Sequence, residues 1–185
     1  MQKWPKTAMV TNKHLSLSLL SFFVLVVTAC IHQTVFTPRE IEEKFSIAIP
    51  EYLAPSEKLN AEAACQFQSL DEEIYLVIAY ENKEFIESFD LQPSLSDYHN
   101  RVVQQGFLEE INDALIDTTI IDTLGQYKQL ITTVRGTINT YPIVYELRII
   151  ETGTAYYQVV LWARKDKFSK HQQDIKRMLA SFKEL

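Results

Sequence analysis

The chain has 185 residues, of which 46% are hydrophobic and 23% charged, and its formal net charge at pH 7 is −6. This composition supports a packed core and excludes a chain that is disordered along its whole length. The acidic balance disfavours nucleic acid as a partner, because nucleic acid attracts basic surfaces.

The N-terminus has the layout of a secretory signal peptide. Lys3, Lys6 and Lys13 give it a positive start, no acidic residue occurs before Glu40, and an apolar stretch covers residues 15–27. A bilayer crossing needs roughly 20 apolar residues. The shorter stretch favours a cleaved signal over a permanent transmembrane anchor.

The end of this segment resembles the bacterial lipobox, since small residues lead directly into a cysteine in Val27-Thr28-Ala29-Cys30. In bacterial lipoproteins a peptidase cuts before that cysteine, whose thiol carries acyl chains such as palmitate. The resemblance implies a signal peptide over residues 1–29 and a lipid anchor on Cys30 in a membrane of the cell envelope. Two or three acyl chains hold a protein firmly, because each buried methylene contributes about 0.8 kcal/mol. An ordinary cleaved signal and an uncleaved helix are the alternatives.

We expect the lipidated N-terminus to continue as a polar tether over residues 30–43, with Pro38 near its middle, so that the domain stands off the bilayer. The residue after the cysteine is Ile31 and not an aspartate. By resemblance to sorted Gram-negative lipoproteins, this implies the outer membrane, facing the periplasm.

The second cysteine of the mature chain, Cys65, has no intramolecular disulfide partner if Cys30 is acylated. It falls in an apolar alternation with Ala63 and Phe67. We therefore predict a small core residue at this position, in preference to a reactive thiol.

The remaining chain, residues 44–185, predicts a single α+β domain. Apolar and polar residues alternate with a period of two in strand-length stretches, which we assign to strands at residues 44–49, 63–69, 74–80, 115–122, 126–138, 142–151 and 154–163. The strands are grouped and do not alternate with helices, which favours a central antiparallel sheet with helices at its faces.

Two amphipathic helices complete the prediction. The first covers residues 94–111, with Ser94 as N-cap and Asp97 in its first turn. The second covers residues 169–183, where Ser169 and Gln172 match a capping box.

Three features together resemble the Mog1/PsbP-like fold group, which includes small bacterial lipoproteins. They are the opening FSIAIP at residues 45–50, a long meander whose aromatic strand ends at Trp162, and a last helix closing with Ser181-Phe182. The resemblance implies an α/β/α sandwich over residues 44–185. It carries no catalytic residues or cofactor, and it implies an accessory, binding or assembly role.

The sequence lacks the common catalytic and phosphate-binding motifs. His99 and His171 lie among polar residues on the predicted helices, so we expect them to face solvent. Asp113, Asp117 and Asp122, together with Glu109 and Glu110, offer carboxylates for a calcium or manganese ion. Residues 117 and 122 face opposite sides of a regular strand, however, so a solvated acidic edge is favoured and no metal is expected.

Aromatic residues are dense on the last predicted strands, at Tyr141, Tyr145, Tyr156, Tyr157 and Trp162. If strand register aligns them, they line a groove for a peptide, glycan or lipid. Ordinary core and cross-strand pairing is the more conservative interpretation, and we favour it.

We therefore predict a lipid-anchored envelope protein that is not an enzyme and that binds or helps assemble an unidentified protein or small molecule. The alternative is an envelope hydrolase whose acidic or metal-assisted site the sequence does not reveal. Binding predicts a concave apolar surface with aromatics, and catalysis predicts a pocket in which a nucleophile or carboxylate meets a histidine or metal. A purely structural role predicts a flat apolar patch.

Overall fold

A computed structural model gives the fold of residues 33–185. Its compact unit begins at Thr34 and runs to the C-terminus. The large sheet contains β3 (Ala54–Pro55), β4 (Cys65–Ser69), β5 (Ile74–Asn82), β6 (Asn112–Leu124), β7 (Tyr127–Ile138), β8 (Tyr141–Glu151) and β9 (Ala155–Arg164). The small sheet contains β1 (Phe36–Ile41), β2 (Phe45–Pro50) and β10 (Lys183–Glu184). The helical segments are α2 (Lys83–Glu87), α3 (Leu95–Gln105), η1 (Phe107–Glu110), α4 (Lys165–Lys170) and α5 (Gln172–Ala180).

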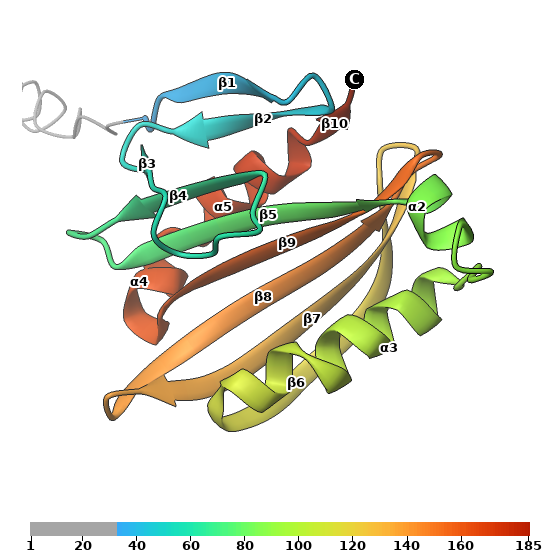
Figure 1. The fold of residues 1–185 in the computed structure, drawn as a ribbon. Helices are drawn as coiled ribbons and strands as arrows, with labels where there is room; N and C mark the ends of the chain where they lie inside the picture. The colour runs from blue at the N-terminus through green and yellow to red at the C-terminus, as the bar shows by residue number, and fades with distance from the viewer. Residues whose placement is uncertain (1–32) are drawn as a thin grey trace, which may run out of the picture. The chain divides into compact units, whose positions relative to one another are not determined.

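The large sheet has the order β3-β4-β5-β9-β8-β7-β6, and all its paired strands are antiparallel. The small sheet has the order β1-β2-β10. Figure 1 shows the large sheet with α3 on one side and α5 on the other. The predicted α+β class, a central antiparallel sheet flanked by helices, is confirmed.

The main core lies between one face of the large sheet and the layer made by β2 and α5. Phe45, Ile47 and Ile49 alternate inward along β2, as expected for a half-buried strand. They pack with buried sheet residues such as Leu76 and Leu161. Full burial of each such side chain contributes about 1.5–3 kcal/mol.

The other face of the large sheet is covered at one end by α3. Tyr98 and Val103 of this helix are fully buried against Leu147 and Ile149 of β8. The helix begins where the sequence predicts, because Ser94 accepts from the Asp97 amide and the Asp97 carboxylate accepts from the Ser94 amide. The predicted N-cap at Ser94 is confirmed, and the capping box that it forms with Asp97 fixes where the helix begins.

The predicted tether is wrong for residues 36–41, which form β1. This strand pairs with β2 along its whole length, from Phe36 opposite Pro50 to Ile41 opposite Phe45. Pro38 is tolerated because β1 is an edge strand, where a missing amide hydrogen costs no ladder bond. The strand is hard to recognise because its middle residues are all exposed, so no apolar alternation marks it.

The single predicted C-terminal helix is also wrong, because α4 and α5 are separate helices that meet at His171. Ser169 caps neither of them. Its hydroxyl donates to the Lys165 carbonyl one turn earlier (3.0 Å), a bond typical of serine inside a helix. The predicted capping box at residues 169 and 172 is therefore absent, and residues 183–184 join the small sheet as β10.

The remaining N-terminal predictions fall on residues 1–32, which lie outside the described part of the chain. Within residues 33–185, no helix has both the length and the apolar character needed to cross a bilayer.

Candidate functional site

Three aromatic side chains form a ladder across the face of the large sheet that α3 leaves partly open. Trp162 on β9 is directly opposite Tyr75 on β5 and Tyr145 on β8. Its ring stacks on Tyr75 with centroids 5.2 Å apart and on Tyr145 at 6.4 Å. Directly opposed residues in antiparallel strands project from the same face of the sheet, so the register itself builds this aromatic ladder.

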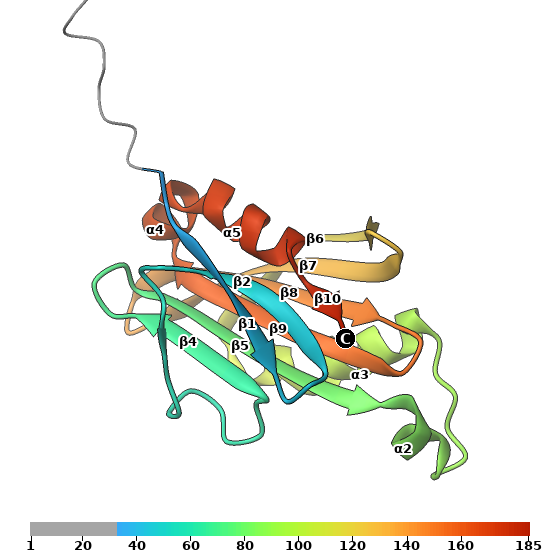
Figure 2. The ribbon, with the colours of Figure 1, turned by 90° about the horizontal axis from the view of Figure 1, so that it is seen from above.

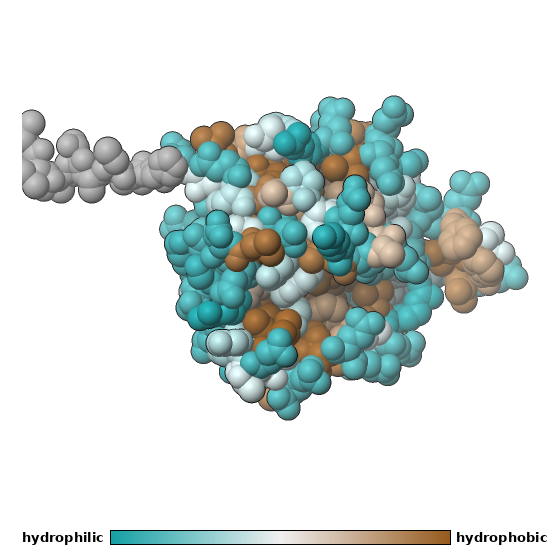
Figure 3. Space-filling model, turned by 60° about the vertical axis from the view of Figure 1, so that its left-hand side comes forward, coloured by the Kyte–Doolittle hydropathy of each residue, from teal (hydrophilic) through white to brown (hydrophobic). Residues whose placement is uncertain are grey.

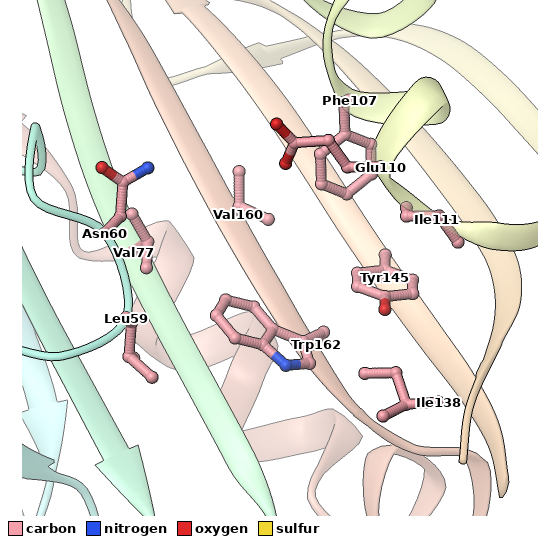
Figure 4. A pocket seen from close by; sticks show the side chains of 10 residues that line it. All are labelled: Leu59, Asn60, Val77, Phe107, Glu110, Ile111, Ile138, Tyr145, Val160 and Trp162. Atoms are coloured by element: carbon pink, nitrogen blue, oxygen red, sulfur yellow. The ribbon is translucent and has the colours of Figure 1, made fainter.

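The ladder forms the floor of two adjoining cavities, of about 290 and 250 Å³, which share Ile138 and Trp162 and which we call the Trp162 hollow. Figure 4 shows the larger cavity, with Leu59 and Asn60 on one side and Phe107, Glu110 and Ile111 on the other. On the face of the molecule seen in Figure 3, apolar side chains gather in a depression bordered by hydrophilic ones.

One wall of the hollow is a loop held in place by Gln66 of β4. The Gln66 side-chain oxygen Oε1 accepts from the backbone amides of Leu59 (2.7 Å) and Asn60 (3.1 Å), and its side-chain Nε2 donates to the Asn60 backbone carbonyl (2.6 Å). One glutamine thus satisfies three backbone groups of the loop. This fixes Leu59 and Asn60 beside the ladder without regular structure.

The opposite wall is η1 with the residue that follows it. Phe107 meets Tyr145 edge to face, with ring centroids 5.5 Å apart. Ile111 packs over Gly136 of β7 so closely that a Cβ at residue 136 would overlap the Ile111 side chain and lie 3.0 Å from the Asn112 carbonyl. The glycine inside this strand marks a close approach of another segment.

The residues lining the larger cavity are mostly apolar or aromatic. Among them Glu110 is the only carboxylate, and there is no histidine, serine, threonine or cysteine. Tyr145 keeps its proton, because burial raises the pKa of its hydroxyl. In the smaller cavity, Arg164 lies over the Tyr141 ring at 5.2 Å and pairs with Glu73 at 3.2 Å.

No family model and no curated protein sequence matches this chain. Several solved structures share its fold. Cyanobacterial PsbP from Synechocystis sp. PCC 6803 has a TM-score of 0.58 at 8% identity, over 84% of this chain and 96% of that one. LpqN of Mycobacterium tuberculosis, described as involved in cell envelope biogenesis, has a TM-score of 0.55 at 10% identity, over 83% and 87%. The Saccharomyces cerevisiae Ran-binding protein Mog1p has a TM-score of 0.52 at 8% identity, over 82% and 96%.

The fold is Mog1/PsbP-like. This confirms the fold resemblance seen in the sequence. At sequence identities of 8–10%, the likeness to these structures concerns the fold alone.

Within this Mog1/PsbP-like fold, the five predicted aromatics do not form one group. Tyr141, Tyr145 and Trp162 line the Trp162 hollow. Tyr156 shares their face but lies under α3, where it stacks on Tyr98 at 4.3 Å and donates to the Pro93 carbonyl (2.6 Å). Tyr157 points to the opposite face, into the main core.

The sequence interpretation missed Tyr75. Its neighbours Ile74 and Leu76 are buried in the main core, so period-two alternation alone puts Tyr75 on the other face. What the sequence does not give is the register that sets Tyr75 opposite Trp162.

The prediction of two solvent-facing histidines is wrong. His99 is 5% exposed on the sheet-facing side of α3, and its Nε2 lies 2.7 Å from the Thr132 hydroxyl. Burial lowers the pKa of His99. His171 Nε2 lies 3.0 Å from the Glu72 carboxylate, where hydrogen bonds from Lys170 and then His171 are the main causes that lower the pKa of Glu72 to about 2.

His99 was misjudged because its polar neighbours hide its position on the helix. It lies four residues after Leu95 and four before Val103, on the stripe that faces the sheet.

The three aspartates do not come together. Asp113 accepts from Thr137, Asp117 pairs with Arg135, and Asp122 accepts from Gln129, each across the β6–β7 ladder. Within residues 33–185, no three histidine, cysteine or acidic side chains are grouped to hold a metal.

Cys65 is half-buried and packs at the margin of the main core. Burial raises the pKa of its thiol to about 12. Since the thiolate is the reactive form, this shift disfavours reaction of Cys65 at neutral pH.

Proposed function

We propose that this protein is a lipid-anchored accessory module of the cell envelope that binds a partner protein, and that the Trp162 hollow receives an apolar side chain of that partner. The anchor is lipid on the thiol of Cys30, which becomes the N-terminal residue when the chain is cut after residue 29. In a Gram-negative cell the domain faces the periplasm from the outer membrane.

The main support for a binding role is that the aromatic ladder is partly exposed to solvent beside a cavity. Trp162 and Tyr75 are only half-buried, although both belong to central strands of the sheet. Covering large aromatic surface is strongly favourable, and tryptophan and tyrosine often dominate protein interfaces. A cavity of about 290 Å³ suits one large side chain as an anchor.

Two further observations support binding over the hydrolase alternative. The larger cavity has Glu110 at its rim but no nucleophile or histidine beside it. Among proteins of the same fold, Mog1p is described as Ran-binding and LpqN as involved in cell envelope biogenesis.

Site-specific photo-crosslinking in intact cells tests this proposal. A benzophenone amino acid replaces Leu59, at the wall of the hollow, in the full-length chain. The matched control carries the same amino acid at Phe85, which is 61% exposed on α2. We expect one protein adduct from position 59 and none of the same mass from position 85.

A second substitution links the adduct to the hollow. Ile138 lines both cavities and is 41% exposed, so Ile138→Glu places a charge in the hollow without disturbing the core. It should lower the adduct yield at least fivefold. An unchanged yield, or crosslinking to lipid only, contradicts the proposal.

A further inference from the structure

One edge of the large sheet is long and exposed, and several of its side chains are apolar. β6 is the last strand in the sheet order, and its exposed side chains include Leu115 (56%), Ile120 (52%) and Ile121 (78%). The opposite edge is blunted, since β3 has two residues and one of them is Pro55. Beyond the register shifts near its start, β6 pairs with β7 without a bulge from Thr118 to Leu124, and it contains neither proline nor lysine, two residues that often protect a sheet edge. Figure 2 shows β6 beyond β7 at one side of the fold.

The turn after β6 shows which backbone groups are free. Leu124 pairs with Tyr127 across the two-residue turn Gly125-Gln126, and Gly125 has φ +59°. Glycine with positive φ at this place is typical of a tight hairpin turn, whose flanking residues bond each other. Since the register is unbroken back to Thr118, alternation directs the amides and carbonyls of residues 119, 121 and 123 away from β7.

We propose that β6 pairs antiparallel with β6 of a second copy of this chain, around a two-fold axis at Ile120. Ile120 then faces its own copy, and Thr119 of each chain is opposite Ile121 of the other. The outward amide and carbonyl groups of Thr119 in one copy hydrogen-bond those of Ile121 in the other. This agrees with the hairpin, which directs the backbone groups of both residues away from β7. The two large sheets become one continuous sheet.

The charges select this register over its neighbours. It sets Asp122 opposite Thr118 and Asp117 opposite Thr123, so no two carboxylates are opposed. Moving the axis to Ile121 sets Asp122 against Ile120, and moving it to Thr119 sets Asp117 against Ile121. In each of these two registers an isoleucine side chain covers an aspartate carboxylate, and burying an unpaired charge is unfavourable.

The same register supplies charge complementarity. The Arg135 guanidinium reaches from β7 over β6 to Asp117. Asp122 of the second copy, opposite Thr118, arrives beside this positive group. A two-fold interface forms each such contact twice, which favours a second copy over an unrelated strand.

Disulfide trapping tests the register. Ile120→Cys is introduced into the full-length chain carrying Cys65→Ala, and membranes are oxidised mildly. The Cα atoms of the two copies of a residue on the two-fold axis lie about 4.5–5.5 Å apart, which is within the reach of a disulfide bond. Ile121→Cys is the matched control: in this register the two copies of residue 121 are about 8 Å apart, from the strand spacing and a two-residue step. We expect a disulfide dimer from residue 120, none from residue 121, and none from Cys65→Ala alone.

A charge on the axis tests the interface without a crosslink. Two differently tagged full-length copies should co-purify from detergent, and Ile120→Lys in both copies should lower co-purification at least tenfold. Phe85→Lys, at a site of similar exposure on α2, should not. The proposal is overturned if residue 120 forms no dimer, dimerises no better than residue 121, or bonds to a different protein. Co-purification that survives Ile120→Lys also overturns it.

Discussion

The wall of the Trp162 hollow depends on Gly136, so Gly136→Ala should destabilise the protein. The added methyl group would overlap the Ile111 side chain and lie 3.0 Å from the Asn112 carbonyl. Overpacking of this kind costs about 1–3 kcal/mol. Replacing a strand glycine by alanine returns about 0.5–1 kcal/mol through backbone entropy. The net loss in free energy of unfolding should be about 1–2 kcal/mol.

Urea unfolding followed by circular dichroism measures this loss. Gly153→Ala is the matched control, because its Cβ meets nothing within 4 Å and its φ is not positive. That variant should be neutral or slightly stabilised. In an Ile111→Ala background, Gly136→Ala should cost about 1 kcal/mol less, since the overlap is gone. Equal effects at residues 136 and 153, or no coupling to residue 111, would refute the close approach.

Three further outcomes follow from the described contacts. Ser94→Ala should cost about 1 kcal/mol in thermal unfolding through loss of the cap, whereas Ser169→Ala should change stability by less than about 0.5 kcal/mol. Because burial lowers the pKa of His99, the unfolded chain takes up the proton first, so stability should fall as pH drops below about 6.5, and His99→Gln should flatten that slope in pH-dependent melting. Gln66→Leu should speed amide hydrogen exchange at Leu59 and Asn60, and unchanged rates would contradict its role in holding the loop.

Most of the central strands were predictable because an antiparallel strand with one buried face shows it as a local alternation, as in β2, β8 and β9. The predicted strand at residues 142–151 differs by one residue from the observed Tyr141–Glu151. β1 was not predictable in this way, because it is exposed along its middle and contains a proline. The helix at Ser94 was predictable because its cap is encoded by residues three apart.

The site was only partly predictable. Three of its aromatics were named in advance, but alternation within a strand does not say which residues of two strands are opposed. The register that aligns Tyr75, Trp162 and Tyr145 depends on the whole sheet. By contrast, Tyr156 and Tyr157 are adjacent in β9, so alternation alone places them on opposite faces of the sheet.

The proposed function rests on the chain being an envelope lipoprotein, and the intact mass of the membrane-extracted protein tests that claim most directly. We predict a mass equal to residues 30–185 plus two or three acyl chains. An unmodified mass for the full 185 residues would contradict the lipid anchor and the cleavage before Cys30.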